Sequence, residues 1–264
     1  MTTKAKRRPG KVVVRSLLIK TVTGGSIPMT QQSIPHQSPV NNYAPATYDI
    51  AYFHSATDKA VKSRSFTFDA LVTELRQSAA TTPHPGMVAL GPRWCDEGHK
   101  AAWKEVKGKS LCAFAPAKFR VPYCEDKNVE SVCMLWIDLD DTPTALVTPL
   151  YKRLAELRLS SVLYETPTKP KPGCVRMRLG IPLSQPVPGS EWKSFWPRAV
   201  AHIGAAELPG LDDACSNPSR IFFLPVQRDD GTPAGISAFV SVPLDPSTVP
   251  AAPSRTRKEK PAPV

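Results

Sequence analysis

The stretch SVCMLWIDLDD, residues 131–141, constrains the fold of this chain more than any other segment. Its apolar run is typical of a buried β-strand, yet the run ends on three carboxylates, Asp138, Asp140 and Asp141. A buried or crowded carboxylate is unfavourable unless a positive charge lies beside it. The segment therefore predicts one of two features, a strand that leads into an acidic turn or a strand that carries a metal site.

Alternation along this strand places two of the carboxylates together. Residues two apart in a strand share a face, so we expect Asp138 and Asp140 to point to the same side while Leu139 packs away from them. Neighbouring carboxylates repel each other unless a cation neutralises both, and Mg²⁺ or Mn²⁺ with oxygen ligands is the natural occupant. The motif alone leaves the metal site and the acidic turn equally open.

A pair of arginines obeys the same rule on a later segment. CVRMRLGIPL alternates so that its apolar residues face one way and Arg176 and Arg178 face the other. Further along, Asp212 and Asp213 precede Arg220, which begins another apolar segment. Guanidinium groups suit phosphate oxygens. The alternatives are arginines on a solvated sheet face and acids in a turn or a helix cap.

The remaining periodicity predicts an α+β fold. The expected elements are a strand at 48–53, a helix from residue 68 with Thr67 as N-cap, a short helix near 99–106 in an otherwise irregular 80–130, a strand at 131–138, a helix from Thr148, strands at 161–165 and 174–183, a helix from Ser190 and a short strand at 220–224. From residue 131 this order is a split β-α-β pattern, as in an RRM-like sheet, with helices on one face and the other face free for a ligand.

Charge is concentrated at the two ends of the chain. Of the net charge of +11, residues 1–20 carry +7 and residues 251–264 carry +3. Residues 1–46, polar and broken by prolines, predict a flexible basic arm, and 245–264 predict a proline-rich basic tail around a folded domain at 47–244. Such ends suit contact with nucleic acid phosphates and serve equally well to keep a protein in solution. The arm residues expected to bind nucleic acid are Lys6, Arg7, Arg8 and Lys11.

Composition excludes several other classes. No apolar run approaches the roughly 20 residues of a membrane span, and the basic start has no cleavage site, so we expect a cytoplasmic protein without a membrane partner. The six cysteines are expected to be free thiols. Cys95, His99, Cys112 and Cys124 resemble scattered zinc ligands, but no CxxC pair supports that reading. There is no GxxxxGK[ST] loop for an ATPase and no close histidine pair for an HUH nuclease.

Three segments together resemble the archaeo-eukaryotic primase superfamily, especially its phage and plasmid replication branch. They are MLWIDLDD, SVLYETPTKPKPGCVRMRLGIPLSQPV and LDDACSNPSRIFFLP, and YDIAYFHSATD with SFTFDALVTELR is similar to the start of those domains. The resemblance covers roughly residues 48 to 228. It implies an RRM-like catalytic sheet packed with an N-terminal α/β unit, so that 47–244 would be a primase-polymerase-like catalytic domain.

The resemblance also implies roles for individual residues. Its metal-binding acids fall on Asp138, Asp140 and either Asp212 or Asp213, of which we prefer Asp212. The residues expected to contact the nucleotide are Thr166, Thr168, Lys169, Arg176, Arg178 and Arg220. The second family motif normally carries a histidine; here the matching turn has none, and Lys169 would supply the cation as a point charge.

The leading functional hypothesis is therefore a DNA primase-polymerase. It would copy a single-stranded DNA template from NTPs or dNTPs by two-metal nucleotidyl transfer with Mg²⁺ or Mn²⁺, in phage or plasmid replication, beside a separate replicative helicase. Two alternatives remain open on the same residues. One is a non-catalytic replication initiator or single-strand-binding module on the same scaffold, and the other is a metal-dependent nuclease.

Overall fold

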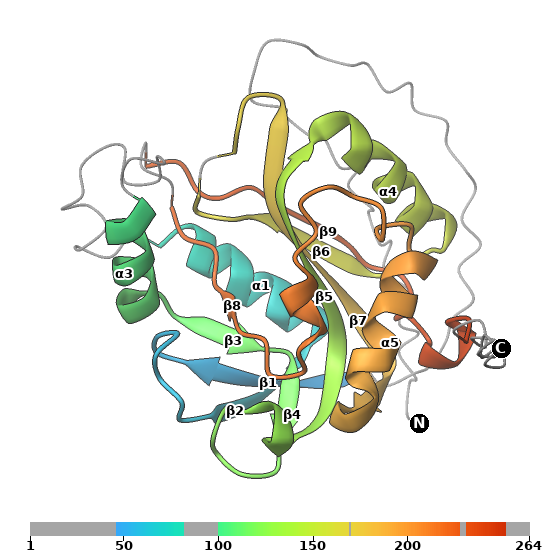
Figure 1. The fold of residues 1–264 in the computed structure, drawn as a ribbon, viewed down its shortest axis with the longest axis horizontal. Helices are drawn as coiled ribbons and strands as arrows, with labels where there is room; N and C mark the ends of the chain where they lie inside the picture. The colour runs from blue at the N-terminus through green and yellow to red at the C-terminus, as the bar shows by residue number, and fades with distance from the viewer. Residues whose placement is uncertain (1–45, 82–99, 169, 228–230, 252–264) are drawn as a thin grey trace, which may run out of the picture. The chain divides into compact units, whose positions relative to one another are not determined.

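Two antiparallel sheets and the helices packed on them form the fold in the computed structural model, which describes residues 46–81, 100–168, 170–227 and 231–251 (Figure 1). All of these residues lie in the unit Tyr43–Val264. The predicted α+β class is confirmed. The predicted nucleic-acid contacts of Lys6, Arg7, Arg8 and Lys11 and the predicted nucleotide contact of Lys169 fall on residues outside the described part of the chain.

The first sheet has the strand order β2-β1-β3-β8, formed by β1 (Thr47–Phe53), β2 (Lys62–Thr67), β3 (Ala113–Ala115) and β8 (Phe222–Phe223). Helix α1 (Phe68–Ala79) follows β2 directly. It begins where predicted because the Thr67 side chain accepts a hydrogen bond from the Ala70 N–H at 3.2 Å. Helix α3 (Lys100–Ser110) covers the short helix expected near 99–106.

The second sheet has the order β4-β5-β7-β6-β9 and carries the candidate site. Its strands are β4 (Ala117–Phe119), β5 (Val129–Pro143), β6 (Ser161–Glu165), β7 (Cys174–Pro188) and β9 (Ile236–Phe239). Strands β5 and β7 are longer than predicted because they pair with each other along most of their length through two register shifts. One of these shifts, between Leu139 and Thr142, falls among the carboxylates.

Helices α4 (Thr144–Glu156) and α5 (Gly189–His202) cover one face of this sheet (Figure 1). The predicted start of α4 at Thr148 is wrong by one turn. Thr144 satisfies the first turn by donating its N–H and its hydroxyl to the Gly173 carbonyl at 3.0 and 3.1 Å. Pro149, expected in the first turn, therefore lies inside the helix. Trp192, Phe195 and Trp196 bury the inner side of α5.

The opposite face of the second sheet is not free, contrary to the expectation from the split pattern. Trp136 packs its ring against Phe114 of β3 and Phe222 of β8, with centroids 5.1 and 5.6 Å apart. The Trp136 ring also lies over Gly180, where an added Cβ would come within 2.4 Å of it. Aromatic packing between the two sheets thus covers the middle of this face and leaves its end, beyond Asp138, as the place for a ligand.

The expected strand at 220–224 is shorter and belongs to the other sheet. Only Phe222 and Phe223 pair, and they pair with β3. The edge of β5 is instead extended by residues 210–212 through a bridge between Leu139 and Leu211. Beyond residue 244 the chain still packs on the fold, since Val249 is buried in the main hydrophobic core. No helix in the described residues is both long and apolar enough to span a membrane.

Candidate active site

Asp138 and Arg178 form a buried ion pair across β5 and β7. The two residues are register partners and each is 5% exposed. Arg178 donates from Nε to Asp138 Oδ2 at 3.0 Å, and its Nη2 lies 3.0 Å from the same oxygen. Burial alone would lower the pKa of the Arg178 guanidinium, but the Asp138 charge and the Tyr164 hydroxyl outweigh it and raise that pKa. The arginine is therefore charged, and its guanidinium fixes the position of the Asp138 side chain.

The rest of the Arg178 guanidinium is tied to aromatic neighbours. Its Nη1 donates to the Phe223 carbonyl at 2.9 Å and contacts the Tyr164 hydroxyl at 3.5 Å. The Tyr164 hydroxyl donates to the same carbonyl at 2.8 Å, and burial raises its pKa to about 12. Arg178 also lies 5.8 Å from the ring centroids of Tyr164 and Phe222. This placement makes Arg178 an internal partner of Asp138 and does not present it to a nucleotide in solvent.

Asp140 and Arg176 form a second pair, two residues further along the same strands. Arg176 Nε lies 2.9 Å from Asp140 Oδ1, and the Asp140 side chain is 50% exposed. Arg176 Nε also lies 3.7 Å from Asp141 Oδ1. The two arginines share a face, as predicted, and the ion pairs show that it is the face that carries Asp138 and Asp140. The outer pair, however, is reached by solvent.

Asp212 lies beside Asp138 on the added edge segment. Its N–H donates to the Asp138 carbonyl at 3.0 Å, and the Asp140 N–H donates to the Gly210 carbonyl at 2.8 Å. Directly opposed residues of an antiparallel pair have Cβ atoms about 5 Å apart, so the Asp138 and Asp212 side chains are neighbours. Gly210 is required for this approach because an added Cβ would meet the Asp140 carbonyl oxygen at 1.9 Å.

The choice between the two acids of LDDAC now has a geometric basis. Asp212 Oδ2 accepts from Arg220 Nη2 at 2.5 Å, and its Oδ1 caps the following turn through the Ala214 N–H at 3.0 Å. Asp213 is exposed, and its backbone carbonyl accepts from the Ser216 hydroxyl. The structure therefore brings Asp212, rather than Asp213, to Asp138.

Each of the three predicted acids thus has one arginine partner, and the cluster is close to neutral. The described residues contain no group of three or more His, Cys, Asp or Glu side chains arranged as a metal site. One feature does fit a cation: Asp138 Oδ1 is buried without a hydrogen-bond partner among the described residues. Mg²⁺ is commonly held by one or two carboxylates together with substrate phosphates. This unpartnered oxygen therefore fits a divalent cation that takes most of its ligands from another molecule.

Several contributors escaped the sequence analysis. Cys215 is buried near the acids, and burial together with the Asp138 and Asp212 charges raises its pKa to about 12. Tyr164 does carry a sequence signal, because it lies two residues before Thr166 in the predicted strand at 161–165. Pairing of this strand with the next places it opposite Arg178. No sequence signal marks Cys215, because its position depends on the turn after Asp212.

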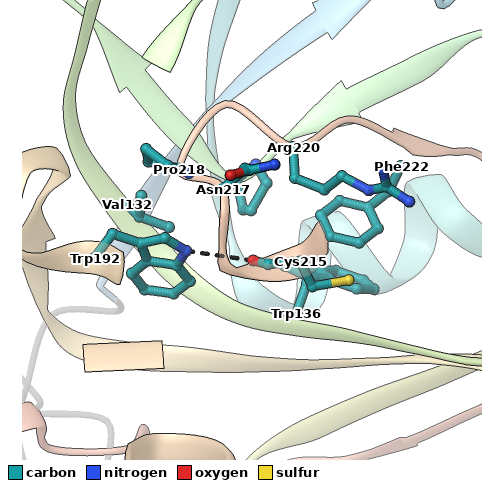
Figure 2. A pocket seen from close by; sticks show the side chains of 9 residues that line it. Val132, Trp136, Trp192, Cys215, Asn217, Pro218, Arg220 and Phe222 are labelled. Atoms are coloured by element: carbon teal, nitrogen blue, oxygen red, sulfur yellow. Dashed lines mark hydrogen bonds between the residues drawn. The ribbon is translucent and has the colours of Figure 1, made fainter. Parts of the chain in front are cut away.

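Arg220 also borders a small pocket (Figure 2). The residues that line it are Pro116, Val132, Trp136, Trp192, Cys215, Asn217, Pro218, Arg220 and Phe222. The Trp192 indole donates to the Cys215 carbonyl at 3.4 Å and so fixes the turn that carries Asp212 (Figure 2). The pocket adjoins the acids through Arg220, the partner of Asp212.

The two predicted threonines lie in the turn after β6. The Thr166 N–H donates to the Arg176 carbonyl at 3.0 Å, which places this turn next to the outer ion pair. The Thr166 hydroxyl is buried and has no hydrogen-bond partner in the described part of the chain. Thr168 is partly exposed.

No family model and no curated protein sequence matches this chain. Two solved structures are similar to it. The AEP domain of the cyanophage S-2L primase-polymerase matches at 16% identity and a TM-score of 0.40, over 76% of this chain and 87% of that one. The polymerase domain of Mycobacterium tuberculosis ligase D, solved in complex with DNA, matches at 12% identity and a TM-score of 0.35, over 81% and 73%. These TM-scores are too low to assign the chain to a family.

Proposed function

We propose that this protein is a nucleotidyltransferase of the primase-polymerase type, which extends nucleic acid on a single-stranded DNA template from NTPs or dNTPs. One observation carries the proposal: three Asp–Arg pairs gather at one end of the second sheet, from three segments far apart in the sequence. Acids next to arginines are what a site needs to bind metal ions and a triphosphate together. The sequence resemblance to primases points to the same acids.

The carboxylates would hold the metal in this proposal. Asp140 and Asp212 are accessible to solvent, while Asp138 neighbours them with one oxygen that has no hydrogen-bond partner among the described residues. Bound Mg²⁺ or Mn²⁺ would activate the attacking hydroxyl and stabilise the leaving pyrophosphate. Arg178 fixes the orientation of the Asp138 side chain, so that the carboxylate would offer the cation the same geometry each time.

Arg176 and Arg220 would bind the phosphates. A guanidinium fork donates to phosphate oxygens as readily as to carboxylate oxygens. Each arginine is paired with an accessible acid here, so arrival of a metal–triphosphate complex would exchange partners: the acid takes the metal and the arginine takes the phosphate. Thr166 and Thr168 would line the triphosphate from the adjoining turn, with Lys169 in place of the family histidine.

The DNA partner would be held in part by the basic arm. Lys6, Arg7, Arg8 and Lys11 belong to an acid-free segment of +7, which suits non-specific contact with the template backbone. In this role the protein would act in phage or plasmid replication beside a separate helicase.

A second candidate is a non-catalytic template-binding module on the same scaffold. It is favoured by the arginine partner on every predicted metal-binding acid and by the absence of a ready three-ligand metal group in the described residues. In that case the Asp–Arg pairs would be structural, and affinity for DNA would depend on salt and not on metal.

A primer-synthesis and extension assay with a matched pair of variants tests the proposal. Asp212→Asn removes an acid that lies next to Asp138, whereas Asp213→Asn changes its exposed neighbour. We expect metal-dependent products from the wild type, a loss of about a hundredfold or more in Asp212→Asn, as for other metal-site groups, and near wild-type activity in Asp213→Asn. Equal activity in the two variants, or shortening of the primer instead of extension, would contradict the proposal.

A further inference from the structure

Asp141 adopts a backbone conformation that non-glycine residues rarely take. Its φ of 53° lies in the left-handed region, at the register shift between β5 and β7. Aspartate tolerates this region better than most residues, but the conformation still costs free energy and persists where surrounding contacts fix it. This strained residue directly follows Asp140 in the sequence, and the contacts of its side chain hold it in place.

The carboxylate of Asp141 holds a loop against the end of β5. Asp141 Oδ1 accepts a hydrogen bond from the Lys171 N–H at 3.1 Å, and its Oδ2 lies 3.7 Å from the Lys171 ammonium group. Its Oδ1 also lies 3.7 Å from Arg176 Nε. The Asp141 side chain is mostly buried, so these contacts form in a partly desolvated place where they are stronger than on an open surface.

The loop in question connects β6 to β7, and residues 166–168 and 170–173 of it are described. Pro170 and Pro172 flank Lys171 and have no N–H, so the Lys171 amide is the one backbone donor of 170–172. Asp141 takes that donor. The end of the loop is closed separately, by the Thr144 contacts to the Gly173 carbonyl.

We propose that Asp141 is a positioning residue that seats this basic loop beside Arg176, and that it thereby sets the affinity for the nucleotide triphosphate. The Lys171 ammonium group remains largely exposed next to the outer ion pair, where it meets an incoming polyanion. This inference rests on the proposed function. It assigns Asp141 to substrate binding, apart from the three acids assigned to the metal.

Two substitutions separate the anchor from the backbone conformation. Asp141→Gly accepts the left-handed φ without strain but removes the carboxylate. Asp141→Asn keeps an amide oxygen for the Lys171 N–H and, like aspartate, tolerates the left-handed region. Both variants are therefore expected to fold, and they differ in whether the loop stays seated.

Loop seating is read by hydrogen exchange at the Lys171 amide, and nucleotide use by KM and kcat for a dNTP or NTP in primer extension. In Asp141→Gly we expect exchange and KM each to rise about tenfold, the effect of losing a charge-assisted hydrogen bond, with kcat nearly unchanged. In Asp141→Asn we expect KM within about threefold of the wild type. Unchanged exchange or unchanged KM in Asp141→Gly would overturn the proposal.

A loss of kcat in Asp141→Gly as large as that in Asp212→Asn would also overturn it, because Asp141 would then act in the chemical step. Failure of the proposed function has a different signature: the wild type itself would neither bind a nucleotide nor extend a primer. The link to nucleotide affinity would fall with it, whereas exchange at Lys171 would still decide whether Asp141 seats the loop.

Discussion

Two ion pairs on the same two strands, only two residues apart, have opposite environments. Asp138 and Arg178 are buried beside Tyr164 and Phe222. Two residues further along the strands, the Asp140 side chain of the outer pair is half exposed. The chemistry of the groups is the same in both pairs. Burial makes the inner pair part of the core, whereas the outer pair is open to solvent through Asp140.

Removing one partner of the inner pair should have the largest effect on stability. Arg178→Met leaves Asp138 buried and uncompensated, and we expect a loss of about 3–5 kcal/mol in the free energy of unfolding. Urea denaturation measures it. In Asp138→Leu/Arg178→Met both charges are gone, and most of that stability should return. A double variant as unstable as the single one would mean that the Arg178 contacts to Tyr164 and Phe223, rather than the ion pair, hold this region together.

The Tyr164 hydroxyl is the next contributor to the inner region. Tyr164→Phe removes its hydrogen bond to the Phe223 carbonyl, and we expect a loss of about 1 kcal/mol at neutral pH. Because burial raises the pKa of Tyr164 to about 12, the folded state keeps the proton longer than the unfolded chain does. This contribution is present below pH ~10 and is lost as the pH rises toward ~12.

Unfolding midpoints at pH 8 and pH 11 test that sign. The wild type should lose more stability between these values than Tyr164→Phe, while Tyr123→Phe, at an exposed site, should follow the wild type. A loss with pH that is equal in all three proteins would place the effect on other buried tyrosines.

The two pairs also differ in what the sequence could predict about them: it could predict the faces on which the side chains lie but not their burial. Alternation in 131–141 and 174–183 correctly placed the two aspartates on a shared face of their strand and the two arginines on a shared face of theirs, because long paired strands obey a strict period of two. It could not show that the first sheet covers Arg178 and not Arg176. That difference depends on β3 and β8, which are too short to give a periodic signal.

The approach of Asp212 to Asp138 and the backbone conformation of Asp141 could not be predicted from the sequence, again because neither depends on a regular element. Asp212 approaches Asp138 through an isolated bridge at Leu211 and a glycine that tolerates close contact, not through a regular strand. The left-handed backbone of Asp141 arises at a register shift, which no residue pattern in the segment announces. Composition and periodicity predict regular helices and strands well, whereas these two positions depend on an isolated bridge and a register shift.

The outer pair should give the smallest change in stability. Because Asp140 is half exposed, a double-mutant cycle of Arg176→Gln and Asp140→Asn should give a coupling free energy below about 1 kcal/mol. Activity should respond more than stability does: we expect KM for the nucleotide to rise about tenfold in Arg176→Gln, as for loss of a charge-assisted phosphate contact. Arg198→Gln, which removes an arginine of α5 that donates to the Ser194 and Pro250 carbonyls, is the control and should leave KM unchanged. A coupling as large as that of the inner pair, with KM unaffected, would make Arg176 a structural partner of Asp140, and phosphate binding would then fall to Arg220 and the basic loop.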